Sequence, residues 1–222
     1  MAFDVMLHLG TLFAVIVYFW SDILQIVRGT VAWIKRREGS EEASLFLWII
    51  VATIPTGLMG VIFKDWFESL FSSPVTCGFT LLITGTTLWL TRFVQREGKA
   101  AREMRWRDAF LIGVAQGVAI IPGISRSGAT LSTGIFCHLR RELAGKFSFL
   151  LSVPAILGAT VLKFREIETD SGAAASLFGA AAAFLVGLFT LKLLMKMIRM
   201  GKLSNFSYYC WAVGILMILL AR

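Results

Sequence analysis

The sequence predicts an all-α, polytopic membrane protein, and this prediction rests on composition and on the lengths of the apolar runs. Of the 222 residues, 57% are apolar and 16% are charged, whereas soluble domains carry about 45–50% and about 25%. The apolar residues cluster in runs long enough for a helix to cross a hydrocarbon core about 30 Å thick. These features exclude a soluble enzyme, a nucleic-acid-binding domain and a disordered tail. We treat residues 1–222 as a single integral membrane domain.

Six apolar runs are expected to cross the membrane: Phe3–Val27, Leu45–Phe63, Val75–Val94, Phe147–Leu162, Ala173–Leu194 and Phe206–Leu220. The first is interrupted by His8 and Asp22, and the second contains Pro55, which neighbouring helices make tolerable in a membrane. Residues 64–74 form a short amphipathic stretch. Three cysteines lie inside apolar runs without metal-ligand spacing, and we interpret them as small packing residues: Cys77, Cys137 and Cys210.

Basic residues are concentrated in alternate loops, which predicts the orientation of the chain. Loops 28–37, 92–107, 140–146 and 192–202 carry 4, 6, 3 and 4 bases, whereas 64–74 and 163–170 carry 1 and 2. Basic loops face the cytoplasm, so the net charge of +8 is explained without nucleic acid. Basic and non-basic loops alternate between the two sides of the membrane only if the segment 109–139 enters the membrane and returns to the side it came from. The same assignment places Met1 and Arg222 on the extracytoplasmic side.

The segment 109–139 is predicted to be a re-entrant hairpin. Ala109–Ile121 is a predominantly apolar run of only 13 residues, a helical rise of about 20 Å that is too short to cross the core. Leu131–Leu139 is shorter still, and Pro122-Gly123 opens the turn between the two runs. Two full spans would satisfy the same parity of sides, but the lengths of the runs argue against them.

The turn of this hairpin carries the candidate binding chemistry. An arginine at membrane depth costs at least about 2.5–3.5 kcal/mol, so Arg126 is a functional hypothesis by default. Hydroxyl groups surround it, Gly123 and Gly128 let backbone approach a ligand closely, and a serine can cap the helix that begins near Gly128. A guanidinium fork, hydroxyls and a helix N-terminus describe an oxyanion site suited to phosphate. The hydroxyl residues are Ser125, Ser127 and Thr130.

Other interpretations of these residues remain open. Arg126 could lie in a loop and extend its charged group to the membrane–water interface, while the serines do no more than cap a helix. Gln116 either lines the cavity or hydrogen-bonds a neighbouring helix. His8 follows Asp4 by one helical turn, so the two form either a packing or capping pair or a catalytic dyad. All 14 acidic residues fall in loops or at run ends, so the residues themselves support anion binding rather than hydrolysis.

The string from Gly113 to Thr130, GVAQGVAIIPGISRSGAT, strongly resembles the second signature of the bacitracin-resistance type undecaprenyl-diphosphatases. The similarity continues through Phe147–Pro154 and Leu9-Gly10-Thr11, and it covers essentially the whole chain in order. The resemblance implies a bacterial plasma-membrane enzyme that removes one phosphate from undecaprenyl diphosphate and so recycles the lipid carrier of cell-wall synthesis. It also implies an inverted-repeat fold with two re-entrant hairpins and an active site open to the extracytoplasmic side.

The resemblance assigns roles to the residues of the turn. Arg126 and Ser125 match the catalytic positions that contact the diphosphate. Thr130 matches a further functional position. The chemistry of the residues themselves adds Ser127 and Gly128 to the phosphate-binding set and makes Gln116 and His8 candidate cavity-lining residues.

The first signature of the family has no match in this sequence. It has the form Glu-Gly-x-Thr-Glu-Phe-x-Pro-x-Ser-Ser-x-Gly-His and supplies the ligands of a divalent metal, Mg or Ca. We therefore expect a chain truncated at its N-terminus relative to the family, without the partner hairpin or a metal ligand of its own, and inactive or nearly so. The alternative function is a non-hydrolytic binder or transporter of anionic lipid or phosphate. A homodimer is compatible with either function.

Overall fold

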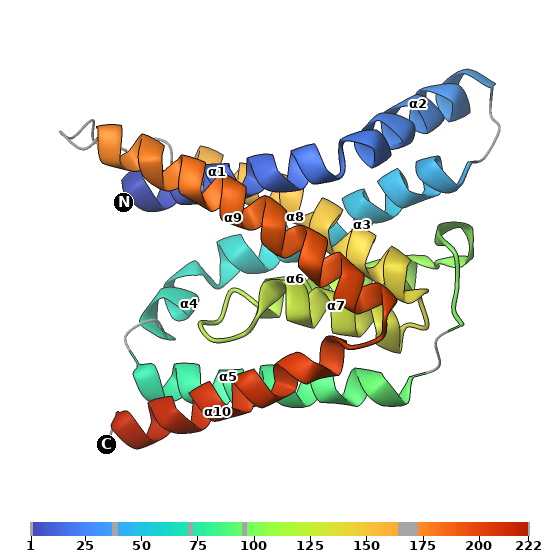
Figure 1. Ribbon diagram of the computed structural model, residues 1–222. Coiled ribbons are helices and arrows are strands. Elements are labelled where there is room, and N and C mark those ends of the chain that lie inside the picture. The colour runs from blue at the N-terminus through green and yellow to red at the C-terminus, as the bar shows by residue number, and fades with distance from the viewer. Residues whose placement is uncertain (1, 37–39, 71–72, 95–96, 164–172, 222) are drawn as a thin grey trace.

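The computed structural model describes residues 2–36, 40–70, 73–94, 97–163 and 173–221, and these residues form helices without a β-sheet (Figure 1). Five helices are long and apolar enough to cross a membrane, and the bent pair α1–α2 makes a sixth candidate. The predicted all-α, multi-span architecture is thus confirmed. The helices are α1 (Ala2–Tyr18), α2 (Trp20–Arg36), α3 (Glu41–Ile62), α4 (Lys64–Leu70), α5 (Pro74–Leu90), α6 (Trp106–Val118), α7 (Arg126–Phe136), α8 (Arg141–Lys163), α9 (Ala173–Arg199) and α10 (Phe206–Leu220).

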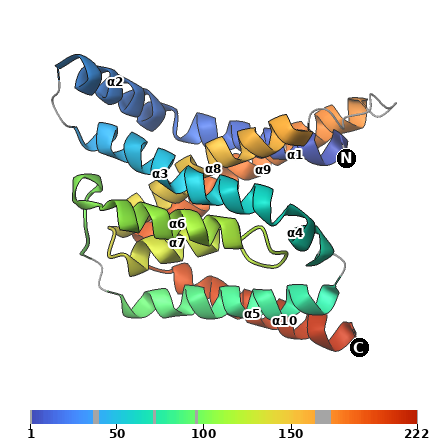
Figure 2. The same cartoon turned by 180° about the vertical axis from the view of Figure 1, so that it is seen from behind.

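The helices pack in pairs around the short helices α6 and α7. Helix α1 lies against α9, α5 against α10, and α3 against α6. Figures 1 and 2 show the α5–α10 pair along one edge of the molecule and the α1–α9 pair along the opposite edge. Apolar side chains gain little by leaving apolar lipid, so helices in a membrane associate mainly through van der Waals packing. Small residues favour this packing because they let two helix backbones approach closely. At Gly113 of α6, for example, an added Cβ would collide with the Ala52 carbonyl of α3.

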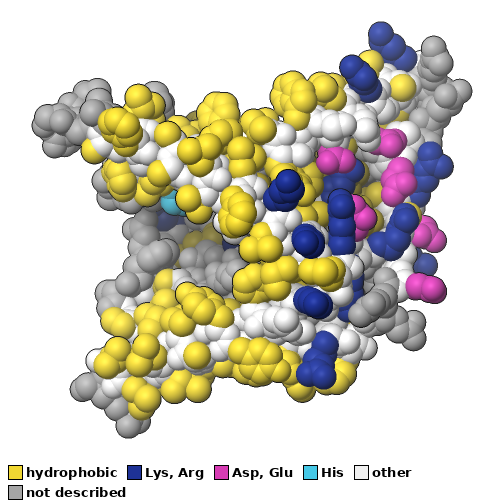
Figure 3. Space-filling model, viewed as in Figure 1, with side chains coloured by type: hydrophobic (Ala, Val, Ile, Leu, Met, Phe, Trp, Pro, Cys, Tyr) yellow, Lys and Arg dark blue, Asp and Glu magenta, His cyan; other side chains and the backbone are white. Residues whose placement is uncertain are grey.

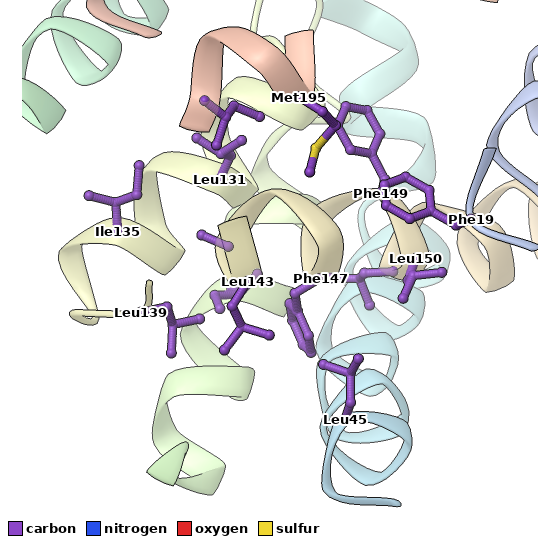
Figure 4. Packing of buried hydrophobic residues seen from close by; sticks show 14 of the residues in the cluster. Phe19, Leu45, Leu131, Ile135, Leu139, Leu143, Phe147, Phe149, Leu150 and Met195 are labelled. Atoms are coloured by element: carbon purple, nitrogen blue, oxygen red, sulfur yellow. The ribbon is translucent and has the colours of Figure 1, made fainter. Parts of the chain in front are cut away.

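The apolar core fixes the position of α7. Leu131 and Ile135 of α7 are almost completely buried, as are Phe147 and Leu151 of α8. Helix α7 packs against α8, and Figure 4 shows Leu131 and Ile135 on α7 and Leu139 beside Leu143 of α8. In a close-packed protein interior, a side chain cannot move without displacing its neighbours. The start of α7 is therefore held in place by contacts along the rest of the helix.

The structure contains the predicted hairpin of two short helices: α6 has 13 residues and α7 has 11. The predicted bounds were wrong, because α6 begins and ends three residues before the run Ala109–Ile121, and α7 covers Arg126–Phe136 rather than Leu131–Leu139. Both ends of the hairpin meet at Lys99. The Lys99 amide donates to the His138 carbonyl at 2.7 Å, and the Arg140 amide donates to the Lys99 carbonyl at 3.1 Å. The Lys99 ammonium group lies 3.2 Å from the Asp108 carboxylate at the start of α6. The hairpin thus enters and leaves at the same end of the molecule.

Charged residues gather at that end. On the face shown in Figure 3, Lys, Arg, Asp and Glu cluster opposite the end where the chain begins and finishes in Figure 1. This grouping agrees with the distribution of basic loops along the sequence. The side of the membrane that each end faces stays a prediction.

The first apolar run is not one straight span, contrary to the prediction for Phe3–Val27. Helices α1 and α2 are bent by 69° at Phe19, whose side chain is only 3% exposed. Its ring stacks on Phe149 of α8, with centroids 6.0 Å apart. Just beyond the bend, Asp22 forms an ion pair with Lys146. The bend therefore buries the Phe19 ring in the core and places the Asp22 carboxylate beside the Lys146 ammonium group.

Three of the expected basic loops are largely helical, which corrects the predicted boundaries. Helix α2 continues to Arg36, α8 begins at Arg141, and α9 continues to Arg199. Lys and Arg have good helix propensity, and positive charge is favourable in the last turn of a helix. At the start of α8, the buried Arg141 side chain instead donates to the carbonyls of Thr91 and Val94. The basic stretches mark the ends of helices rather than loops.

Candidate functional site

The candidate site is the turn between α6 and α7, at residues 119–125. Gly123 has φ +86°, a conformation that costs little only for glycine. Ser125 is the N-cap of α7, and its Oγ accepts a hydrogen bond from the Gly128 amide at 3.1 Å. The helix therefore begins at Arg126, slightly earlier than the predicted start near Gly128. Helix geometry leaves the amides of Arg126 and Ser127 without an intrahelical acceptor, at the positive end of the dipole.

Two threonines of α5 hold this turn. Thr80 Oγ1 donates to the Pro122 carbonyl at 2.6 Å. Thr84 Oγ1 donates to the Gly123 carbonyl and accepts from the Ser125 amide, both at 3.2 Å. Both threonines are buried and lie one helical turn apart near the middle of the candidate span Pro74–Phe93. The turn is therefore beside the middle of a span, and not in a loop at the end of the molecule.

The sequence alone did not identify Thr80 and Thr84. Threonines in membrane helices commonly bond their own helix, as Thr86 and Thr87 do here with the carbonyls of Leu82 and Ile83. Only the four-residue spacing, which puts Thr80 and Thr84 on one face of α5, could have distinguished them.

Thr84→Val is expected to lower the phosphatase activity that the resemblance implies by about 10- to 100-fold, because it removes both hydrogen bonds that fix Gly123 and Ser125. Leaving buried backbone groups unpaired costs about 1–3 kcal/mol, which would let the turn leave its productive geometry. Thr84→Ser keeps the hydroxyl and should restore most of the activity. Steady-state kinetics of the two variants tests this, and equal activity of both would contradict it.

The structure brings the predicted phosphate-binding residues together at the start of α7, with different exposures. Arg126 and Ser127 are half-buried in its first turn. Thr130 is buried: its Oγ1 donates to the Arg126 carbonyl at 2.9 Å and also contacts the Ser148 hydroxyl of α8. Thr130 thus links the first turn of α7, at the Arg126 carbonyl, to Ser148 of α8.

The two candidate cavity-lining residues lie in different surroundings. Gln116 is 2% exposed, and its Nε2 lies 3.5 Å from both Thr56 Oγ1 of α3 and the Leu151 carbonyl of α8. These contacts favour hydrogen bonding between helices over cavity lining. His8 is exposed on α1. The side chain of Asp4 lies outside the described residues, so the proposed His8–Asp4 pair stays a prediction.

The described residues do not form a metal site by themselves. Among them, no group of three or more His, Cys, Asp or Glu side chains lies close enough together to hold an ion. Cys77, Cys137 and Cys210 are free thiols. The half-buried guanidinium, the hydroxyls and the helix N-terminus at the turn are instead suited to binding an anion.

Comparison with known proteins identifies the family of the chain. The family described as Bacitracin resistance protein BacA matches residues 1–216. The chain belongs to this family. The match includes the whole hairpin, and it confirms the resemblance that the sequence of the turn indicates.

Three of the curated relatives that the chain matches have the same name. A protein of Methanosphaera stadtmanae named Undecaprenyl-diphosphatase is 38% identical over 233 residues, which cover 100% of this chain and 84% of the relative. A protein of Alkaliphilus metalliredigens with the same name is 42% identical, over 97% of this chain and 82% of the relative. A third, from Methanothermobacter thermautotrophicus, is 47% identical over 179 residues, which cover 77% of this chain and 97% of the relative.

Proposed function

We propose that this protein is an undecaprenyl-diphosphate phosphatase. Water cleaves the phosphoanhydride bond of the lipid diphosphate, which yields the lipid monophosphate and inorganic phosphate. The observation that carries the proposal is the Ser125-Arg126-Ser127 start of α7, which Thr80 and Thr84 hold beside the middle of a span. Membership of the family and the names of the relatives support the same reaction.

Arg126 has the chemistry expected of a residue that binds a diphosphate. Its guanidinium can donate two parallel hydrogen bonds to one phosphate group, which are stronger than bonds between neutral groups. The amides at the start of α7 add positive potential in the same place. As the anhydride bond breaks, charge grows on the phosphate oxygens, and donors already in place stabilise that charge without reorganising.

Ser125 can serve the helix and the substrate at once. Its Oγ accepts from the Gly128 amide, which uses one lone pair and leaves the hydroxyl hydrogen free to donate to a phosphate oxygen. Ser127 offers a second hydroxyl in the same helical turn. Thr130, whose hydroxyl is directed to the Arg126 carbonyl, is assigned a positioning role.

The metal and the orientation stay proposals. The resemblance implies Mg²⁺ or Ca²⁺, but the described residues offer no ligand set for either ion. For the orientation, we place the charged end of the molecule in the cytoplasm because basic loops face that side. The turn of the hairpin would then open to the extracytoplasmic side of the plasma membrane.

Phosphate release from purified protein and undecaprenyl diphosphate in detergent tests the proposed function. Because the family findings favour hydrolysis over the expectation of an inactive chain, we expect release to exceed that from a parallel reaction with undecaprenyl monophosphate, which has no anhydride bond. Binding of the lipid diphosphate without release would contradict the proposal and favour the alternative, a non-hydrolytic binder.

A further inference from the structure

A small crevice beside the turn has no part in the anion chemistry described above. It has a volume of about 180 Å³ and is lined by residues of α5, α6 and α7 together with Ile124. Its walls are mostly apolar, and they include Ala115 and Val118 of α6. Thr84, which holds the turn, also lines it.

The crevice lies beside the candidate anion site and extends to exposed side chains of α5 and α6. At the protein end, Ile124 and Gly128 line it, and these residues flank Ser125-Arg126-Ser127 on both sides. At the outer end, Ile83 is 58% exposed and Val118 is 36% exposed. Ile83 belongs to a candidate membrane span, so this outer end faces hydrocarbon.

A lipid diphosphate needs such a connection. Its long apolar chain is stable in the bilayer, and the cost of removing it grows with each methylene group exposed to water. Its diphosphate, by contrast, must reach the polar turn. Both demands are met if the chain leaves the site sideways between helices.

We infer that this crevice, between α5 and the α6–α7 hairpin, binds the isoprene units next to the diphosphate of the lipid substrate. This inference rests on the proposed function. Drug-sized ligands occupy pockets of about 300–1,000 Å³, so a crevice of 180 Å³ holds only the first one or two five-carbon units. The rest of the chain stays in the bilayer, and the crevice selects for a prenyl group beside the diphosphate rather than for a particular chain length.

Filling the crevice tests the inference. Ala115→Leu adds three carbon atoms to its wall and leaves Arg126 and the serines untouched. We expect KM for both farnesyl and undecaprenyl diphosphate to rise about 10- to 100-fold, the effect of steric mismatch in an apolar pocket. The inhibition constant of inorganic diphosphate, which has no prenyl group, should stay within about twofold. The matched control is Ala181→Leu on the exposed face of α9, which should change neither constant.

An unchanged KM for the prenyl substrates in Ala115→Leu would overturn the inference, and so would an equal weakening of inorganic diphosphate in a folded variant. If Ala115→Leu does not fold, photolabelling of the wild-type chain decides. A farnesyl diphosphate with a diazirine on its first isoprene unit should cross-link to peptides of α5 and α6. Cross-links confined to other helices would overturn the inference. Labelling needs no turnover, so its outcome is distinct from a failure of the proposed function.

Discussion

Replacing Arg126 with alanine is expected to lower kcat/KM for undecaprenyl diphosphate by about 100- to 1,000-fold. This is the usual loss when one preorganised donor to a developing oxyanion is removed. Arg126 is half-buried at the first position of α7, where its guanidinium adds a full positive charge to the partial charge of the helix N-terminus. The loss should fall mostly on kcat, because negative charge builds up on the leaving phosphate oxygen as the anhydride bond breaks, and a donor to that oxygen binds the transition state more strongly than the substrate.

Arg126→Lys is the informative companion to this variant. It keeps the charge but loses the planar fork that binds phosphate through two hydrogen bonds, so its activity should lie between wild type and Arg126→Ala. Thermal unfolding of both variants should stay close to that of the wild type, since Arg126 is only half-buried at the first position of α7. Phosphate release at the wild-type rate by folded Arg126→Ala would remove Arg126 from the site.

Gly123→Ala is expected to disrupt the turn itself. Gly123 has φ +86°, which costs a residue with a Cβ about 1–2 kcal/mol. The added Cβ would also collide with Thr80 Oγ1 and lie 2.5 Å from the Cys77 carbonyl, and overpacking of this kind costs about 1–3 kcal/mol. We therefore expect a lower unfolding temperature and a loss of activity of at least about 100-fold, because the carbonyls that α5 holds must move.

Gly57→Ala is the matched control. Gly57 lies within α3, and a Cβ at this position meets nothing within 4 Å. Alanine in a helix interior is favoured over glycine by roughly 0.5–1 kcal/mol, so this variant should be as stable as the wild type or more stable, and fully active. Equal behaviour of the two variants, in unfolding temperature and in phosphate release, would contradict the importance of the turn.

The hairpin was predictable because its signals are local. A 13-residue apolar run cannot cross a membrane, Pro122-Gly123 ends it, and Ser125 is a good N-cap for the helix that follows. An arginine at that break is costly unless it serves a purpose. Each signal depends on neighbouring residues. The structure shows the two short helices and the N-cap at Ser125, although α6 ends at Val118, four residues before Pro122.

What the sequence missed depends on partners far along the chain. The bend at Phe19 follows from its stacking on Phe149, 130 residues later. Thr80 and Thr84 matter because the Pro122–Ser125 turn packs against α5. The sequence allowed Gln116 either to line a cavity or to hydrogen-bond a neighbouring helix, and its contacts with α3 and α8 favour hydrogen bonding between helices. Tertiary packing decided these points, and no pattern within a single helix could reveal them.

The most direct test of the account is the accessibility of position 127 to a membrane-impermeant thiol reagent. Cys77, Cys137 and Cys210 are first changed to alanine, and Ser127→Cys is then labelled in sealed vesicles of known orientation. Arg107→Cys, exposed at the start of α6, is the control for the opposite side. We expect position 127 to react only from the extracytoplasmic side and undecaprenyl diphosphate to protect it, whereas position 107 reacts only from the cytoplasmic side and without protection. Labelling of position 127 from the cytoplasm, or labelling that the lipid diphosphate does not slow, would contradict the account.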